Sequence, residues 1–377
     1  MTEANRRMSA AEDVVNADLD YINAEAAEEF SELSGKELLI AGGAGFLGYY
    51  LVQAPLNWNK NHGGEAPIKV TVLDNFIRGV PAWLTALETN PNLRLIKHDI
   101  SNPLPADLGD MEYLIHGASI ASPTFYRKYP IETMDANVNG LRFMLEYAVA
   151  QKRKQKAVGG ILFYSSSEIY GDPTPENIPT PETYRGNVSC TGPRACYDES
   201  KRYGETLCVH FARQYELPIK VARPFNNYGP GLKITDRRVI PDFARDIFDG
   251  RDMVMLSDGA AQRTFCYVAD AVAGYYKVLV KGRPGEAYNV GVETPEISVA
   301  ELARRLAALS RELFGYTGQV VFKASTDKDY LVDNPSRRCP IITKARTELG
   351  YDPKVMIDDG LRRSLIWYSG NREASDA

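Results

Sequence analysis

The sequence predicts an α/β fold, in which a doubly wound parallel sheet carries a smaller mixed α/β domain at its C-terminal end. Three observations predict it. Apolar runs alternate with helical stretches from residue 36 onward, a glycine-rich turn follows the first run, and Asp74 ends the second. Nearly continuous apolar runs are typical of strands buried on both faces of a parallel sheet. Strand–helix alternation is typical of Rossmann-type folds.

Residues 1–35 form an acidic extension before the first strand, with nine acidic and two basic residues. Val15, Leu19 and Ile22 repeat at i, i+4 and i+7, which predicts a helix with a narrow apolar stripe. Such a helix packs on its own chain or on a neighbour, and a disordered arm is the remaining possibility.

Six strands and six longer helices are predicted in the rest of the chain. The strands are 37–42, 68–74, 93–99, 113–119, 160–167 and 219–225. The helices are 131–151 and 198–215 within the sheet region, followed by 241–250, 267–280, 298–314 and 358–368.

Composition sets limits on the function. At 377 residues the chain is long enough for two domains of ~150 residues. No apolar run reaches the ~18 residues of a membrane span, and the N-terminus has no apolar secretory segment. Outside the extension, 40 acidic residues face 42 basic ones, which argues against nucleic acid as a partner. Five cysteines without a CxxC pair indicate reduced thiols and a cytoplasmic location, and no metal site is predicted.

The glycine-rich turn predicts a dinucleotide site. Gly42, Gly45 and Gly48 allow a tight turn, close approach to a pyrophosphate and a helix N-terminus behind it. Asp74 follows Gly48 by 26 residues and can accept hydrogen bonds from ribose hydroxyls, which favours NAD over NADP. Arg78 nearby is the one feature that favours NADP. The alternative to a dinucleotide site is that these glycines serve only to form the turn. The predicted NAD contacts are Gly42, Gly45, Phe46, Leu47, Gly48, Asp74, Asn75, Phe76, Arg78, Asp99, Ile100, Ala118, Asn137, Tyr197 and Lys201.

Tyr197 and Lys201 predict a catalytic pair, because residues four apart share one face of a helix. They follow a strand that ends in Ser165–Glu168, at the sheet edge where such folds place their sites. To remove a sugar hydroxyl proton, the phenol pKa of about 10 must fall by roughly three units. A neighbouring ammonium and a cationic nicotinamide ring supply that shift, and Ser166 can hydrogen-bond to the same hydroxyl.

The chain resembles the extended short-chain dehydrogenase/reductases that act on nucleotide sugars, and most closely the UDP-glucuronate decarboxylases. The motifs GGAGFLG, LDNF, HDI, ASIASP, SSSEIYG, GPRACYDESKR, ARPFNNYGP, QRTFCYVAD and NVG carry this resemblance between Glu37 and Tyr368. Ser167 stands where the related 4,6-dehydratases have an acidic residue, and Glu168 stands where 4-epimerases have a small or uncharged one. The alternative for Glu168 is a turn cap.

The resemblance implies a reaction. Tyr197, Lys201 and Ser166 would oxidise C4 of UDP-glucuronate with NAD, and the 4-ketone would lose CO2 to give UDP-xylose or the 4-keto pentose. Arg263 would lie near the reacting carboxylate, and Glu168 would position the ring or relay a proton. The implied substrate contacts are Tyr126, Asn226, Arg263 and Arg338. A homodimer through helices 131–151 and 198–215 is also implied.

Other functions stay open at this point. A nucleotide-sugar 4-epimerase or 4,6-dehydratase would use the same 4-keto intermediate, and a non-catalytic NAD(H)-binding protein is a remote possibility. The expected organisation is an extension at 1–35, an NAD-binding domain at 36–222 and a mainly substrate-binding part at 223–377, from which some segments return to the sheet. One departure from the resemblance concerns Gly231, where many decarboxylases have an arginine.

Overall fold

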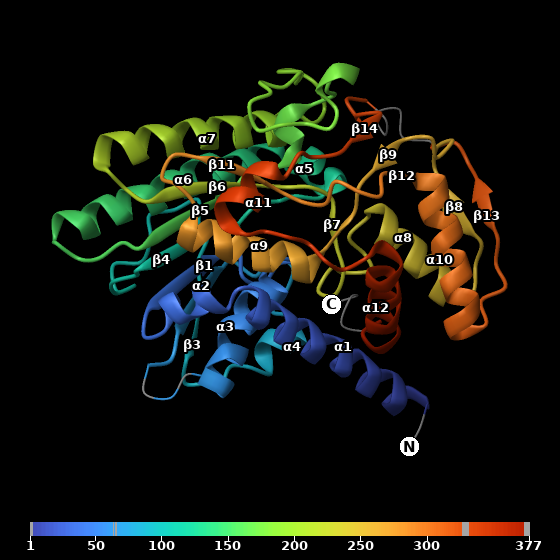
Figure 1. The fold of residues 1–377 in the computed structure, drawn as a ribbon, viewed down its shortest axis with the longest axis horizontal. Helices are drawn as coiled ribbons and strands as arrows, with labels where there is room; N and C mark the ends of the chain where they lie inside the picture. Colours follow the sequence, from blue (N-terminus) through green and yellow to red (C-terminus); the bar gives the residue numbers. More distant parts are fainter. Residues whose placement is uncertain (1–2, 63, 65, 326–331, 373–377) are drawn as a thin grey trace.

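The computed structural model describes residues 3–62, 64, 66–325 and 332–372. Its centre is a seven-stranded sheet in the order β11-β6-β5-β4-β1-β2-β3, with every neighbouring pair parallel (Figure 1). This arrangement confirms the predicted doubly wound α/β fold. The strands are β1 (Glu37–Ala41), β2 (Lys69–Asp74), β3 (Leu93–Lys97), β4 (Tyr113–His116), β5 (Gly160–Tyr164), β6 (Ile219–Pro224) and β11 (Ala287–Val290).

Both faces of the sheet are covered because both faces of its strands are apolar. Side chains alternate along a strand, so Leu38 and Ile40 of β1 enter one core and Leu39 enters the other. Helices α6 (Pro130–Arg153) and α7 (Ala195–Tyr215) cover the Leu39 face. Helices α3 (Gly48–His62) and α9 (Val268–Lys281) cover the other face, and Figure 1 shows these two layers on opposite sides of the sheet.

The strand order reverses at β1. The chain proceeds from β1 to β2 and β3 on one side, then crosses to β4, β5 and β6 on the other. Ligands of open α/β sheets bind outside the carboxyl ends of the strands at such a switch point. The loops after β1 and β4 are therefore the expected location of the cofactor site.

The C-terminal part is a lobe of short strands and helices beside the sheet (Figure 1). Its strands form small sheets, of which β12-β9-β14 matters for the site. From this part β11 returns to the main sheet beside β6, a seventh strand that the six apolar runs did not include. The elements of the lobe are α8 (Val239–Phe248), β8 (Met253–Met255), β9 (Gln262–Arg263), β12 (Ile297–Ser298), α10 (Val299–Phe314), β13 (Val320–Phe322), β14 (Arg337–Arg338) and α12 (Ile357–Gly370).

Shorter elements complete the described chain. They are α4 (Ala82–Thr85), α5 (Pro123–Lys128), η1 (Ser167–Tyr170), η2 (Pro175–Asn177), β7 (Asn227–Tyr228), β10 (Cys266–Tyr267) and α11 (Thr343–Leu349). Within the described ranges, no helix combines the length and the apolar character that crossing a membrane requires.

The N-terminal extension is helical and packs on its own chain. Helices α1 (Glu3–Glu25) and α2 (Ala27–Leu33) run along α3, α9 and α12, as Figure 1 shows for α1. Leu19 and Ile22 of the apolar stripe are buried. The fully buried Asp18 accepts hydrogen bonds from the hydroxyls of Tyr50 (2.6 Å) and Tyr267 (2.5 Å) and from Arg363 Nη1 (2.8 Å). The extension is thus joined to residues from three distant parts of the chain.

We expect Asp18→Ala to lower the free energy of unfolding by about 2–6 kcal/mol, because it leaves two buried hydroxyls without their acceptor and removes one of the two carboxylates that bind Arg363. Chemical denaturation followed by circular dichroism measures this change. Asp13→Ala, which removes an exposed acid from the same helix, is the matched control and is expected to have little effect. Equal stabilities of the two variants would contradict the role assigned to Asp18.

Candidate active site

The turn between β1 and α3 is closely packed, and at two of its glycines there is no room for a side chain. Gly42 has a φ of +82°, and a Cβ there would lie 2.6 Å from the backbone of Ala118 at the end of β4. A Cβ on Gly48 would lie 2.1 Å from the carbonyl oxygen of Gly43. Helix α3 begins at Gly48, so the positive end of its dipole faces this turn. The turn fits a dinucleotide pyrophosphate.

Asp74, at the end of β2, is hydrogen-bonded to the same turn. Its Oδ2 accepts from Ala44 N (3.0 Å) and its Oδ1 from Phe76 N (2.9 Å). Burial raises the pKa of Asp74 above its ordinary value. Each carboxylate oxygen keeps a second lone pair, so the group can still accept from ribose hydroxyls.

The neighbouring predicted contacts continue around this end of the sheet. Asn75 hydrogen-bonds to Asp99, and hydrogen bonds from Ser101 hold the pKa of Asp99 below its usual range. Ile100 is buried against Gly140 of α6, where a Cβ would lie 2.9 Å from it. Asn137 of α6 donates to Ser200 Oγ of α7 (2.9 Å), which fixes the two helices to each other next to the site.

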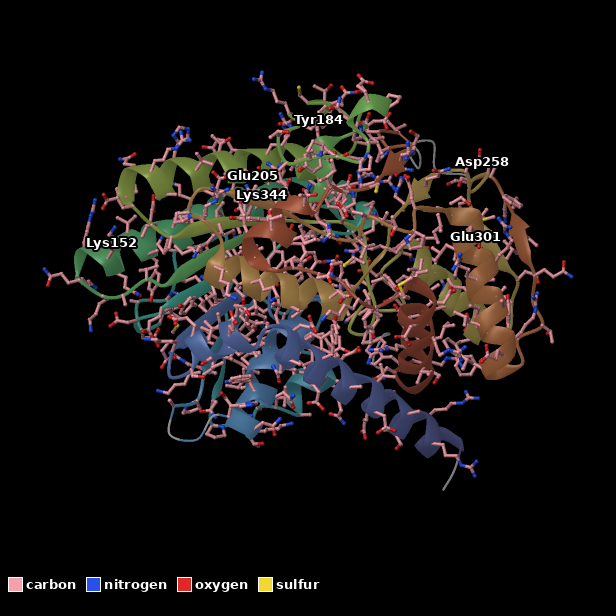
Figure 2. The ribbon with its side chains drawn as sticks, viewed as in Figure 1. Lys152, Tyr184, Glu205, Asp258, Glu301 and Lys344 are labelled. Atoms are coloured by element: carbon pink, nitrogen blue, oxygen red, sulfur yellow. The ribbon has the colours of Figure 1, made fainter. Side chains whose placement is uncertain are left out.

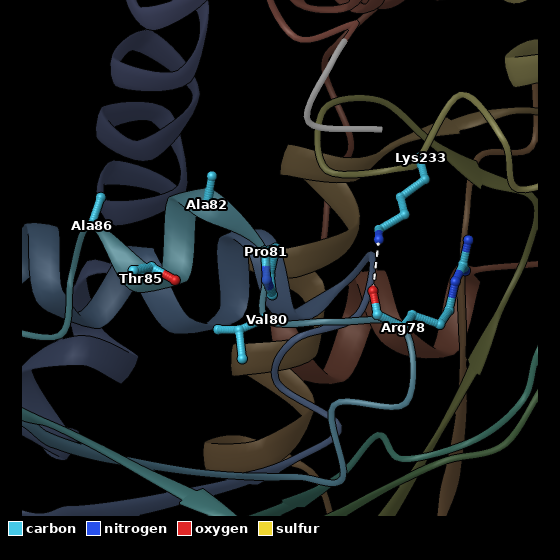
Figure 3. A pocket seen from close by; sticks show the side chains of 7 residues that line it. All are labelled: Arg78, Val80, Pro81, Ala82, Thr85, Ala86 and Lys233. Carbon is cyan, nitrogen blue, oxygen red and sulfur yellow. Dashed lines mark hydrogen bonds between the residues drawn. The ribbon is translucent and has the colours of Figure 1, made fainter. Parts of the chain in front are cut away.

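Arg78 lies farther out, at the edge of a hollow of about 520 Å³ (Figure 3). Its Nη1 lies 3.4 Å from Asp236 Oδ2, and its guanidinium lies 5.3 Å from the centroid of the Phe125 ring. Lys233 Nζ donates to the carbonyl oxygen of Arg78 (3.1 Å), as the dashed line in Figure 3 shows. The hollow is also lined by Val80, Pro81, Ala82, Thr85 and Ala86. None of the predicted catalytic residues lines it.

Phe46 and Leu47 form the far side of the glycine turn. Phe46 lies under the guanidinium of Arg238, whose centre is 6.0 Å from the ring centroid, and Leu47 packs against the core that α3 covers. Gly231, which departs from the family pattern, is close to this turn. A Cβ on Gly231 would lie 2.4 Å from the Cβ of Tyr49, so no side chain fits there and the arginine contact of many decarboxylases is missing.

Ser166, Tyr197 and Lys201 come together at the carboxyl end of β5. Tyr197 lies in the first turn of α7, which begins three residues earlier than the predicted helix, and its side chain hydrogen-bonds with Ser166. Lys201 Nζ donates to the carbonyl oxygen of Tyr164 (2.8 Å) and lies 5.6 Å from the centroid of the Tyr197 ring. All three side chains are buried. The expected catalytic set is therefore assembled.

Burial shifts both titrating groups of this set toward their neutral forms. It raises the pKa of Tyr197 to about 12 and lowers the pKa of Lys201 to about 7. A phenol with that pKa does not ionise near neutrality. Its activation therefore requires positive charge from a bound cofactor together with the ammonium of Lys201.

Glu168, in η1, lies between two arginines that are far away in sequence. Arg338 Nη2 donates to Glu168 Oε2 (2.6 Å), Arg338 Nη1 binds Oε1, and Arg194 Nη2 also binds Oε2. Burial opposes the charge on Glu168, but the two guanidinium groups outweigh it and hold its pKa below the ordinary value. Ser167 is buried beside Glu168 at the start of η1. These contacts show that Glu168 does not serve as a turn cap.

Arg263 lies opposite Arg338, since β9 and β14 pair in register at these two residues. Its guanidinium donates to the carbonyl oxygens of Pro335 (2.5 Å) and Ser336 (3.2 Å) and so holds the segment that leads into β14. Burial, and then the nearby charge of Arg338, lowers the pKa of Arg263 to about 9.

Tyr126 and Asn226 flank the same region. The Tyr126 ring stacks on the Tyr197 ring, with centroids 5.1 Å apart and planes 14° apart. Its hydroxyl is buried and has no hydrogen-bond partner among the described residues. Asn226 has a φ of +42° and donates from Nδ2 to the carbonyl oxygen of Thr264 (2.9 Å).

Sequence reasoning did not single out Arg194 and Asp198. Arg194 stands just before α7, and besides binding Glu168 its guanidinium lies 6.0 Å from the centroid of the Tyr126 ring. Asp198 Oδ2 lies 3.9 Å from Arg194 Nε. The sequence did contain a signal that could have identified them, because both residues belong to the motif GPRACYDESKR and lie within one helical turn of Tyr197.

A buried ion pair fixes α7 to the sheet beneath this cluster. Glu205 of α7, labelled in Figure 2, accepts from Arg223 Nη2 of β6 (2.6 Å) and from Ser165 Oγ at the end of β5 (2.5 Å). Arg223 Nη1 also donates to the hydroxyl of Tyr170 at the end of η1 (2.7 Å). The ion pair and its hydrogen bonds thus hold α7, β5, β6 and η1 together. They set the position of Tyr197 relative to Glu168.

Comparison with known proteins assigns the family. The sequence model of the NAD dependent epimerase/dehydratase family matches residues 38–291. The chain belongs to this family. UDP-glucuronic acid decarboxylase 5 of Arabidopsis thaliana is 37% identical over 87% of this chain and 88% of its own length. UDP-glucuronic acid decarboxylase 1 of Xenopus tropicalis is 36% identical over 90% and 73%.

Solved structures of the epimerase/dehydratase family share the fold. The dTDP-glucose 4,6-dehydratase DesIV of Streptomyces venezuelae, solved with NAD bound, has a TM-score of 0.75 and 28% identity over 89% of this chain and 98% of that one. The UDP-glucose 4-epimerase of Thermotoga maritima, solved with UDP-glucose, has a TM-score of 0.73 and 25% identity over 89% and 100%. These findings confirm the predicted resemblance, the NAD cofactor and an enzymatic function.

We expect Gly48→Ala to weaken NAD binding by roughly 10- to 100-fold. The added methyl group collides with the carbonyl of Gly43, and forcing an extra carbon into a packed site costs about 1–3 kcal/mol. Isothermal titration with NAD measures the effect. Gly250→Ala is the control: its added Cβ meets no atom within 4 Å, and although its φ of +67° makes the change locally strained, the position lies outside the turn and the NAD affinity should stay unchanged. An unchanged affinity in Gly48→Ala would contradict the assignment of this turn to the cofactor.

Proposed function

We propose that the chain is a UDP-glucuronate decarboxylase that works through a 4-keto sugar and yields UDP-xylose or the UDP-4-keto-pentose. One observation carries the proposal. Beside Tyr197 and Lys201 lies a buried cluster in which Arg194 and Arg338 both bind Glu168. Such a cationic cluster suits an anionic sugar, because guanidinium groups form strong paired hydrogen bonds with carboxylates and phosphates. The decarboxylase names of the relatives support the same substrate.

NAD would be held along the glycine turn, Asp74 and the loops that follow β3 and β4. When bound, NAD+ would supply the acceptor for the C4 hydride; return of that hydride would give UDP-xylose, whereas release of the 4-keto pentose would leave the cofactor reduced. The side chains that would contact it are the predicted ones, from Gly42 in the turn to Tyr197 and Lys201 in α7. Asp74 would accept from the ribose hydroxyls, and Arg78 would lie at the adenosine end.

Tyr197 is the general base in this proposal. Its phenolate takes the proton of the sugar 4-hydroxyl, and Ser166 donates a hydrogen bond to the same oxygen. In its charged form Lys201, whose Nζ lies 5.6 Å from the centroid of the Tyr197 ring, would favour the phenolate, because a nearby positive charge stabilises it.

Decarboxylation then follows from the position of the ketone. The C4 carbonyl is β to the carboxylate on C5, so the C5–carboxylate bond breaks and its electron pair moves into an enolate at C4. Hydrogen bonds from Tyr197 and Ser166 stabilise that negative oxygen as it forms. A proton is added at C5, and reduction of the ketone completes the reaction.

The remaining side chains would orient the substrate. Arg338 and Asn226 would contact the diphosphate side, Tyr126 the sugar, and Arg263 the carboxylate or its proton source. Glu168 would position the ring or relay a proton. Ser167 has no acidic proton for a leaving hydroxyl, which argues against a 4,6-dehydratase.

Mass spectrometry of UDP-glucuronate after incubation with the purified protein, with and without added NAD+, tests the proposal. Loss of the mass of one CO2 is expected. A further loss of two hydrogens would identify release of the 4-keto pentose. An unchanged mass with a new chromatographic peak would mean epimerisation, and no change would mean another substrate; both would overturn the proposal.

We also propose a homodimer in the cytoplasm, formed by packing α6 and α7 of two copies as a four-helix bundle. Ile131 on α6 and Tyr203 on α7 support this interface, because they are large apolar side chains with 59% and 49% exposure. Five cysteines without disulfides support the location. The division at residues 35 and 222 into extension, NAD-binding and mainly substrate-binding parts belongs to the same proposal.

Tyr203→Glu is expected to give a monomer, because a charge placed on this exposed apolar surface opposes its burial against a second copy. Light scattering coupled to gel filtration measures the mass. A variant with the same mass as the wild-type protein, whether both are dimers or both are monomers, would contradict the proposed interface.

A further inference from the structure

Asp198 is a buried acid beside the catalytic tyrosine that receives no strong hydrogen bond. It is 4% exposed, and its Oδ1 has no partner among the described residues. The closest cationic atom is Arg194 Nε, at 3.9 Å from Oδ2, which is a contact but not a hydrogen bond. Arg194 Nε is itself buried without an acceptor.

The two carboxyl groups that share Arg194 are in different situations. Glu168 takes hydrogen bonds from both Arg194 and Arg338, so its charge is compensated. No hydrogen bond from the described residues reaches Asp198, whose Oδ1 is buried without a partner there, and a buried carboxylate without donors is costly unless it binds a proton. Burial, and then the charge of Glu168, raises the pKa of Asp198 to about 8. The neutral acid is therefore the form expected at neutral pH.

The charged and titratable groups that face Asp198 come from four elements and from the segments before two of them. They are Glu168 from η1, Tyr126 from α5, Cys196 and Tyr197 from α7, Arg338 from β14, Arg194 from just before α7 and Asp333 from the segment before β14. Two arginines favour an ionised Asp198, and two acids oppose it. An additional carboxylate brought to Arg194 by a ligand would oppose ionisation further.

We propose that Asp198 is the positioning residue of Arg194 and that, above neutral pH, where part of Asp198 is ionised, it takes up a proton from solvent when the carboxylate of the nucleotide sugar binds near Arg263 and Arg194. This inference rests on the proposed function. The neutral acid leaves Arg194 available to the substrate, whereas an ionised Asp198 competes for the same guanidinium. Because the product has lost its carboxylate as CO2, the proton returns to solvent once the product occupies the site.

The pH dependence of KM tests this role. In the wild-type protein the KM for UDP-glucuronate should rise above about pH 8, by up to about tenfold per pH unit, as Asp198 ionises. In Asp198→Asn, a neutral side chain of the same shape, this rise should disappear or move to higher pH by at least about one unit. Glu199→Gln, the next position on α7 and half-exposed, should keep the wild-type profile.

A merely structural role predicts something different. Asp198→Asn would then lower kcat and the melting temperature at every pH and leave the shape of the KM profile unchanged, which would overturn the inference. If the wild-type protein does not act on UDP-glucuronate at neutral pH, the proposed function itself fails, so the two failures are distinguishable.

Proton uptake can be measured directly. Decarboxylation itself consumes a proton, so the titration is done in the Tyr197→Phe background, in which turnover is expected to be slow. Titration calorimetry of this protein with UDP-glucuronate near pH 8, in two buffers of different ionisation enthalpy, should show uptake of a fraction of a proton on binding. No uptake is expected when Asp198→Asn is added to the same background, nor when UDP-xylose, which lacks the carboxylate, is the titrant. Equal uptake with and without Asp198→Asn would also overturn the inference.

Discussion

Tyr197→Phe is expected to lower kcat by about 10²–10⁴-fold, and to leave the affinity for NAD nearly unchanged. The change removes one oxygen, the atom that accepts the sugar proton, and keeps the ring that stacks on Tyr126. Most of the other side chains assigned to the cofactor, above all those of the turn between β1 and α3 and Asp74 at the end of β2, are untouched. Stopped-flow or steady-state turnover together with NAD titration separates the two properties.

Tyr215→Phe is the matched control for this change. Tyr215 is the last residue of the same helix, at the end away from the catalytic cluster, and the variant should be fully active. A Tyr197→Phe protein with wild-type turnover would exclude the phenol as the base. A variant that loses NAD affinity in parallel with activity would mean that the ring, and not its hydroxyl, is what matters.

Glu168→Gln is expected to have the largest effect on stability of any change in the site. Without the carboxylate, the guanidinium groups of Arg194 and Arg338 remain buried with no charge between them. Removing one partner of a buried ion pair costs about 3–5 kcal/mol. We therefore expect the free energy of unfolding to fall by that amount at neutral pH, together with a loss of decarboxylation.

The pH dependence of stability gives this prediction a second readout. The folded-state pKa of Glu168 lies below its value of 4.5 in the unfolded chain, so its contribution is fully present above that pH and is lost as the pH falls further. Acid unfolding of Glu168→Gln should lack this part of the wild-type dependence. Glu176→Gln, an exposed acid in the neighbouring η2, should unfold like the wild-type protein. Equal acid sensitivity of wild-type and Glu168→Gln proteins would contradict the ion-pair account.

The regular elements were predictable because each has a local signature. Apolar runs located six of the seven sheet strands to within a few residues, and helical periodicity located α6, α7, α8, α9, α10 and α12, but not the short α11, in the same way. The exception, β11, has only four residues and obtains its place from pairing with β6. A strand of that length carries too little pattern to separate it from a loop.

The predicted site residues were found by motif, whereas their partners were not. Ser166, Tyr197 and Lys201 lie close in sequence to recognisable segments, and the fold brings them together. The ion pairs of Glu168 join residues separated by 26 and 170 positions, and no local pattern encodes such contacts. The sequence did not indicate Asp198 for another reason. Its proposed role follows from the hydrogen bonds that it does not receive from the described residues, and only three-dimensional packing shows that these are missing.

The contact between α1 and α12 has a consequence for how the protein is made. Helix α1 is translated before α3, α9 and α12, against which it packs, and its Asp18 binds Arg363, which lies 345 positions later. During synthesis, the part of α1 that rests on α12 therefore stays uncovered until α12 has been translated. Complete docking of α1 is then a late event of biogenesis, and polypeptides that stall before α12 would present this part of α1 to chaperones and proteases.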